Sequence, residues 1–173
     1  MKKFDAFEVA FARLFDERFV SLYRYLDCLS GDPDLAEDLA QEAFVRLHRR
    51  REIPNDARAW LAAVASNLFR DERRNERRRQ NLLARQPADL TLGSPPASPH
   101  DAVEHGERAA RVRRALDRLP LRDREMLLLR HEGHSYREIA TAVGVAETSV
   151  GTMLIRATEA FRAEFAGRNS ASD

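Results

Sequence analysis

The chain has 173 residues, enough for one ordinary domain or two small ones. Its 29 lysines and arginines nearly balance its 28 aspartates and glutamates, so the composition is not that of a protein that coats nucleic acid through bulk positive charge. The single cysteine, Cys28, excludes an intramolecular disulfide and is typical of the reducing cytoplasm, and we expect it to be a small buried side chain. Acids interrupt the first apolar run early, so we expect neither a signal peptide nor membrane insertion.

Helix-forming residues dominate, and glycine and proline are scarce outside one stretch, which predicts an all-α protein. The first segment, residues 5–29, is expected to be helical with a break near Asp16 and an end at Gly31. We interpret as core its aromatic and leucine side chains, which recur at helical spacing: Phe7, Phe11, Leu14, Phe15, Leu22, Tyr23 and Leu26.

The dipeptide Asp32-Pro33 predicts the start of a second helix, with aspartate as the N-cap and proline in the first turn. Apolar residues at helical spacing mark one buried face of this helix. The rest of its surface is acidic and includes Asp38, Gln41 and Glu42. Such a face is either simply solvated or a docking surface for a basic partner.

A short polar loop at residues 49–55 leads to Asp56, the predicted N-cap of a third helix. Trp60 opens the apolar side of this helix, either as half-buried core or as a surface on which an unpaired base stacks. The helix continues into a run of arginines: Arg70, Arg73, Arg74, Arg77, Arg78 and Arg79. These residues are either a solvated helix end supported by nearby acids or a stripe that binds phosphates.

Residues 81–106 hold four of the seven prolines together with glycine and serine, which predicts a flexible linker. We therefore predict two helical domains, residues 1–80 and 107–166, followed by a disordered polar tail at residues 167–173. The second domain is expected to start with a helix from Glu107 to Leu119 that Pro120 ends. Another helix is expected from about Arg122 to Glu132.

The region from Ser135 to Phe165 has the pattern of a helix-turn-helix. Ser135 and Glu138 have the spacing of a capping box, and Gly144 allows the positive φ that a steep turn between helices needs. The second helix, from about Glu147, has one apolar face, and its other face carries Thr148, Ser149, Thr152 and Arg156. That polar face suits a DNA major groove, although such a helix pair is also compatible with plain core packing.

Motifs for catalysis and cofactor binding are missing from the sequence, including GxxxxGK[ST], GxGxxG, HExxH and GxSxG. His131 and His134 are three residues apart, but no clear third ligand accompanies them, and zinc normally needs three or four. We expect both histidines at a helix end or in a loop. The sequence therefore predicts no metal, no cofactor and no enzymatic activity.

Three blocks of sequence, taken in order, resemble the bacterial sigma factors of the extracytoplasmic-function type. DLAEDLAQEAFVRL, residues 34–47, is similar to the family's second region, whose helix docks on the β′ clamp of RNA polymerase. ARAWLAAVASNLFRDERRNERRR, residues 57–79, resembles the part of that region that reads and opens the −10 element. ALDRLPLRDREMLLLRHEGHSYREIATAVGVAETSVGTMLIRA, residues 115–157, resembles the fourth region, which binds the −35 element.

The resemblance implies that the chain binds core RNA polymerase, through the β′ clamp and the β flap, together with promoter DNA, and that an anti-sigma factor controls it. It assigns polymerase binding to Asp38, Gln41 and Glu42. It assigns the −10 element to residues of a loop and a helix: Arg51, Asn55, Asp56, Trp60, Asn67, Arg70, Arg73 and Arg74. It assigns the −35 element to Thr148, Ser149, Thr152 and Arg156.

The sequence departs from the family pattern at several positions. The loop before Trp60 is shorter than in many members, and Ser66 stands where arginine is common. Gly151 and Met153 stand where members often carry lysine and arginine, and Ala146 replaces the usual serine N-cap. Because the glycine and the missing cap each cost about 1 kcal/mol of helix stability, we expect a weaker −35 contact.

The residues also allow a stand-alone helix-turn-helix regulator whose N-terminal bundle dimerises or senses a ligand. Such a protein would bind a palindrome without polymerase. The acidic helix at residues 34–47 and the arginine-rich helix argue against this alternative. A helical enzyme or adaptor is a third interpretation, and the missing motifs disfavour its enzyme form.

Overall fold

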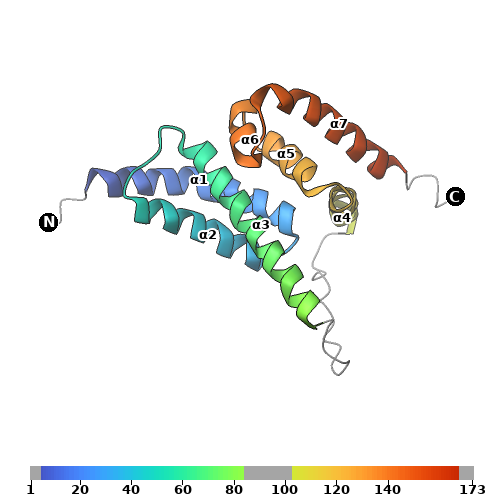
Figure 1. Cartoon of the computed structure of the whole chain (residues 1–173), viewed down its shortest axis with the longest axis horizontal. Coiled ribbons are helices and arrows are strands. Elements are labelled where there is room, and N and C mark those ends of the chain that lie inside the picture. The colour runs from blue at the N-terminus through green and yellow to red at the C-terminus, as the bar shows by residue number, and fades with distance from the viewer. Residues whose placement is uncertain (1–4, 84–102, 168–173) are drawn as a thin grey trace.

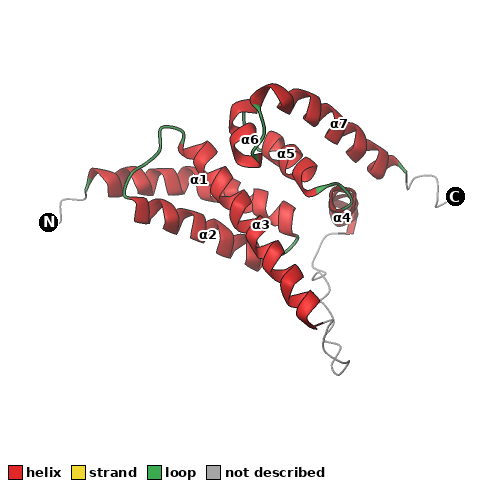
Figure 2. Cartoon of the chain, in the orientation of Figure 1, coloured by secondary structure: helices red, strands yellow, loops and turns green. Residues whose placement is uncertain are grey.

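The structure is a computed structural model that describes residues 5–83 and 103–167. These residues form helices joined by short turns, and no strand occurs among them (Figures 1 and 2). The first unit contains α1 (Ala6–Ser30), α2 (Pro33–Arg50) and α3 (Ala57–Leu83). The second contains α4 (Val103–Asp117), α5 (Leu121–His131), α6 (Tyr136–Val143) and α7 (Glu147–Ala166). The all-α prediction is confirmed.

The first helix differs from the prediction in one respect, because α1 runs through Asp16 without a break. No glycine or proline lies between Asp5 and Ser30, and an exposed aspartate on a long amphipathic helix does not interrupt it. The helix ends as predicted at Gly31, whose φ of 73° places it in the left-handed region. Cys28 is exposed, so the prediction that its thiol is buried was wrong.

The core of the first unit lies where α1, α2 and α3 meet. Asp32 caps α2 by accepting from the backbone N–H groups of Asp34 and Leu35, as its spacing with Pro33 predicts. The buried Tyr25 hydroxyl lies 2.7 Å from that of Ser66, so each has a hydrogen-bond partner. Position 66 is therefore core in this chain and is not available to a partner.

The second unit contains the predicted helix-turn-helix. Ser135 and Glu138 form both bonds of a capping box at the start of α6, and Gly144 ends α6 with a φ of 72°. The axes of α6 and α7 then meet at 88°, as a steep turn requires. Both α3 and α4 extend into the segment predicted as linker, to Leu83 and from Val103, and residues 84–102 and 168–173 lie outside the described part of the chain.

The two units pack directly against each other. In Figure 1 the long α3 crosses α1 and α2, and α6 lies beside its first half, where the two helices are in contact. A second contact joins α1 to α5. The buried side chains of the two units form one continuous apolar cluster, which includes Leu26, Leu61, Phe69, Met126 and Ile139.

Among the described residues, no single helix is both long and apolar enough to cross a membrane. Only α6 and α7 taken together reach that length and composition, and they are bent sharply at Gly144.

Candidate nucleic-acid and protein interfaces

The outer face of α7 carries the four residues that the sequence assigns to the −35 element. Thr148, Ser149, Thr152 and Arg156 are all exposed, whereas Val150, Leu154 and Ala157 on the other side are buried. Because three of the four exposed side chains are short and polar, a groove edge can approach the helix backbone closely. Ala146 makes no side-chain cap bond, as expected from its missing hydroxyl.

Two neighbours of this face were not singled out from the sequence. Tyr136, at the start of α6, is 44 % exposed, and the Arg130 guanidinium lies 5.5 Å from the centre of its ring. Ile155 is 62 % exposed on α7 itself. The exposed aromatic ring and the cation widen the surface around α7, and the periodicity of α7 gives no signal for them because they come from two other helices, α6 and α5.

Gly151 lies between this face and Tyr136, with room for a side chain. A Cβ added there would meet the Tyr136 ring at 3.5 Å, an ordinary van der Waals contact. We expect Gly151→Lys to raise the affinity for a duplex DNA fragment and to steepen the fall of log K with log salt by about 0.9 per added phosphate contact. Fluorescence anisotropy at several salt concentrations measures both quantities.

The matched control is Gly151→Gln, which gains the same helix propensity without a charge. It is expected to change the salt slope little. Equal slopes for the lysine and glutamine variants would show that position 151 does not face phosphate.

The residues assigned to the −10 element lie along α3 in two groups. Asn67, Arg73 and Arg74 are exposed, and Trp60 is half-buried on the apolar side of the helix. Arg74 pairs with Asp71 at 3.2 Å, and the Arg73 guanidinium lies 5.9 Å from the Phe69 ring centre. These exposed contacts are weak and are easily exchanged for phosphate or base contacts.

Arg70 belongs to the same set but turns toward the second unit. Its Nη2 donates to the Glu125 carboxylate at 2.8 Å and to the Ala142 carbonyl at 3.2 Å, and its Nη1 donates to Asn67 at 3.0 Å. Glu125 is 1 % exposed, and burial raises the pKa of its carboxyl although Arg70 opposes this. Arg70 is therefore engaged by the second unit, whereas Arg73 and Arg74 remain exposed on α3.

The loop residues of the −10 set are largely engaged within the first unit. Arg51 has a φ of 56°, and its guanidinium pairs with Asp5, the N-cap of α1, and with Glu8 in the first turn of α1. Asp56 caps α3 by accepting from the Ala59 N–H at 2.9 Å. Asn55 is exposed and directly precedes Asp56 at the end of the loop.

The acidic face of α2 presents Asp38 and Gln41 to solvent and Glu42 at its edge. Glu42 accepts from Arg46 at 2.9 Å, and Gln41 donates to Glu37 at 3.0 Å. Asp38 makes no ion pair with any residue that the structure describes.

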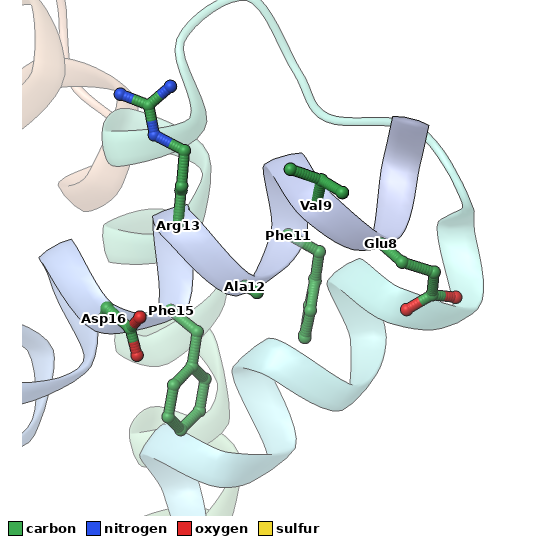
Figure 3. Close-up of a pocket in the computed structure, with 7 residues that line it drawn as sticks. All are labelled: Glu8, Val9, Phe11, Ala12, Arg13, Phe15 and Asp16. Atoms are coloured by element: carbon green, nitrogen blue, oxygen red, sulfur yellow. The ribbon is translucent and has the colours of Figure 1, made fainter. Parts of the chain in front are cut away.

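A shallow apolar groove runs between α1 and α2 beside this face. Phe11 and Phe15 point from α1 toward α2, and Glu8 lies at one end of the row (Figure 3). Gln41 and Val45 of α2 line a neighbouring hollow that shares Phe11 and Phe15 with it. An acidic helix next to partly exposed aromatic rings is an arrangement that suits a partner with both basic and apolar side chains.

Among the residues that the structure describes, the titratable side chains do not assemble into a metal centre. Within residues 5–83 and 103–167, no group of three or more His, Cys, Asp or Glu side chains is placed to hold a metal ion.

Comparisons with known proteins agree with this division of the molecule. Residues 14–79 match the family model of sigma-70 region 2, and residues 109–160 match that of sigma-70 region 4. The ECF RNA polymerase sigma factor SigL of Mycobacterium tuberculosis H37Rv is 35 % identical over 163 residues, which cover 91 % of this chain and 90 % of SigL. BldN of Streptomyces coelicolor is 32 % identical and covers 86 % of this chain, which spans 57 % of BldN.

Two solved structures share the fold. The sigma factor RpoE in complex with the anti-sigma factor NepR, from Bartonella quintana, has a TM-score of 0.68, with 21 % identity over 90 % of this chain and 96 % of RpoE. CnrH in complex with the cytosolic domain of CnrY has a TM-score of 0.64, with 21 % identity over 96 % of this chain and 91 % of CnrH.

Proposed function

This chain belongs to the ECF RNA polymerase sigma factors, and we propose how its helices divide the work of that family. The chain is a sigma factor, rather than a stand-alone regulator: it directs core RNA polymerase to promoters and initiates transcription there. Its action is binding, first to polymerase and then to promoter DNA, and it performs no enzymatic step of its own. It works in the cytoplasm, where core polymerase and the chromosome are found.

In this proposal, α2 binds core RNA polymerase. Asp38, Gln41 and Glu42 face the β′ clamp, and the groove lined by Phe11 and Phe15 extends that surface. Exposed carboxylates attract a basic helix, while exposed rings supply the apolar area that a stable complex needs. The second unit contacts the β flap. An anti-sigma factor controls the protein by covering these surfaces.

Promoter recognition falls to α7 and α3. Thr148, Ser149, Thr152 and Arg156 enter the major groove of the −35 element. The −10 element is opened and held by the loop and by α3: Arg51, Asn55, Asp56, Trp60, Asn67, Arg70, Arg73 and Arg74. Opening a duplex exposes unstacked bases, which bind to aromatic and cationic side chains of this kind.

The observation that carries the proposal is the presence of both regions, in order, on one chain, with most of the residues assigned to partners exposed. The test is run-off transcription by purified core polymerase on genomic promoter fragments, with and without this chain. Transcripts that require the chain are expected, and their start sites identify its promoters. Absence of transcripts, together with no co-elution of chain and core polymerase, would refute the assignment.

A further inference from the structure

Among the described residues, three arginines donate to a backbone carbonyl across the boundary between the two units. Arg70 of α3 donates to the Ala142 carbonyl at 3.2 Å, and Arg124 of α5 donates to the Leu29 carbonyl at 3.2 Å. Arg58, at the start of α3, donates to the Glu132 carbonyl. These carbonyls lie at or near helix C-termini, where carbonyl groups lack helical partners and carry partial negative charge.

Two of these arginines also pair with a buried carboxylate of the other unit: Arg58 lies 3.6 Å from Glu138, and Arg70 makes the shorter contact, with Glu125. Arg70 binds one oxygen of Glu125 at 2.8 Å, and the side chain of Glu125 is 1 % exposed. The other carboxylate oxygen of Glu125 is buried and has no hydrogen-bond partner. A buried carboxylate that is only half satisfied is costly, so the contact between the units is held less firmly than an apolar contact of the same size.

Glu125 binds the Arg70 guanidinium through the same kind of contact that a DNA phosphate would make. Guanidinium groups bind carboxylate and phosphate oxygens through the same charge-assisted hydrogen bonds. Asn67, also assigned to the −10 surface, accepts from Arg70 and so helps to orient it toward Glu125. While this pair is intact, Nε and Nη2 of Arg70 are engaged by Glu125 and the Ala142 carbonyl, and Nη1 is engaged by Asn67.

We propose that Arg70 and Glu125 form an intramolecular latch that holds the two units closed and withholds Arg70 from DNA until the units separate. This inference rests on the proposed role of Arg70 at the −10 element. In the closed protein, the Glu125 carboxylate occupies the Arg70 hydrogen-bond donors that would otherwise bind a promoter phosphate. Separation of the units hydrates Glu125 and frees Arg70, so opening and acquisition of the −10 contact occur in one step.

The latch is tested by single-molecule energy transfer on the full chain, without polymerase or DNA. Dyes are attached to Val45→Cys on α2 and Ile155→Cys on α7, both exposed positions, after Cys28→Ser removes the exposed native thiol. The parent is expected to show one population. Arg70→Gln and Glu125→Gln are each expected to raise the ratio of open to closed molecules by about tenfold or more.

Glu164→Gln is the matched control, because it removes a carboxylate that pairs with Arg118 at 3.0 Å inside the second unit. It is expected to leave the energy transfer unchanged. Circular dichroism shows whether each variant keeps its helices. Arg70→Gln changes a partly exposed side chain, so it tests the ion pair without altering the buried core around Glu125. Parent-like energy transfer in both variants would overturn the proposal.

Binding of a single-stranded oligonucleotide of mixed sequence tests the second half of the inference. Glu125→Gln is expected to bind at least about threefold more tightly than the parent, because Arg70 becomes available. Arg70→Gln opens the units but is expected not to gain this affinity. Opening of Glu125→Gln without tighter binding would overturn the claim that the latch withholds Arg70, whereas failure of the sigma assignment itself would appear only in the run-off assay.

Discussion

Replacing Asp38 by arginine is expected to weaken the complex with core RNA polymerase by at least about tenfold. Asp38 is exposed on α2 and has no ion-pair partner among the described residues, unlike Glu42, which pairs with Arg46. Its charge is therefore fully available to a basic partner. A reversed charge at this position meets that partner with repulsion, and like charges across an interface cost several kcal/mol.

Titration of labelled protein with core polymerase measures this affinity, and run-off transcription should fall in parallel. Glu17→Arg is the matched control: it reverses another exposed acid, on α1, outside the residues that line the groove. The difference between the two variants should shrink as salt is raised, because exposed charges are screened. Equal losses for Asp38→Arg and Glu17→Arg would indicate a general charge effect and would contradict a docking role for Asp38.

The features of the fold that the sequence predicts correctly are fixed by neighbours in the chain. Asp32 caps α2, and Ser135 with Glu138 forms a capping box, because the groups that bond lie within three residues of each other. Gly144 takes its left-handed φ for a similarly local reason. Spacing alone is sufficient where both partners of an interaction lie in one turn.

Long-range partners could not be predicted in this way. Arg70, Arg73 and Arg74 look equivalent in the sequence, yet only Arg70 reaches a residue 55 positions away in the second unit. Nothing in the local pattern indicates that Glu125 is buried, since it ends a run of four charged residues in α5. The direct packing of α6 on α3 follows from the shapes of two complete units and leaves no periodic signal.

The same contrast between local and long-range contacts applies to the residues of the candidate site. Exposure of the polar face of α7 follows from the spacing of its apolar residues, so the sequence alone identifies it. Arg51 is different, because its ion pairs with Asp5 and Glu8 bring together segments more than 40 residues apart. Which arginines are already engaged and which are available to DNA is therefore a property of the tertiary structure.

His134 is a second residue whose role depends on that packing. The sequence predicts a histidine at a helix end or in a loop, and it does lie between α5 and α6, but it is 6 % exposed and faces the first unit. Burial lowers its pKa from 6.5 to about 4, and the nearby Arg58 and Arg18 act in the same direction. Glu138 and Asp56 oppose this shift.

Acidification is therefore expected to destabilise the folded protein through His134. Because folding lowers the pKa, the unfolded chain binds this proton more readily between pH 6.5 and about 4. The free energy of unfolding then falls as the pH falls through that window. The contribution of His134 is on the order of 2 kcal/mol between about pH 7 and pH 5. Urea unfolding of the parent and of His134→Gln over this range measures it.

The comparison with His134→Gln isolates this effect from the other groups that titrate in the same range. Burial raises the pKa of Glu125, which favours the folded state at low pH, but this contribution is common to both proteins and cancels in their difference. Near neutral pH both side chains at position 134 are uncharged, so the difference there reports packing alone. The glutamine variant should lose less stability on acidification, because an amide acquires no charge. Parallel pH profiles for the two proteins would mean that the imidazole is not held neutral between Arg58 and Arg18.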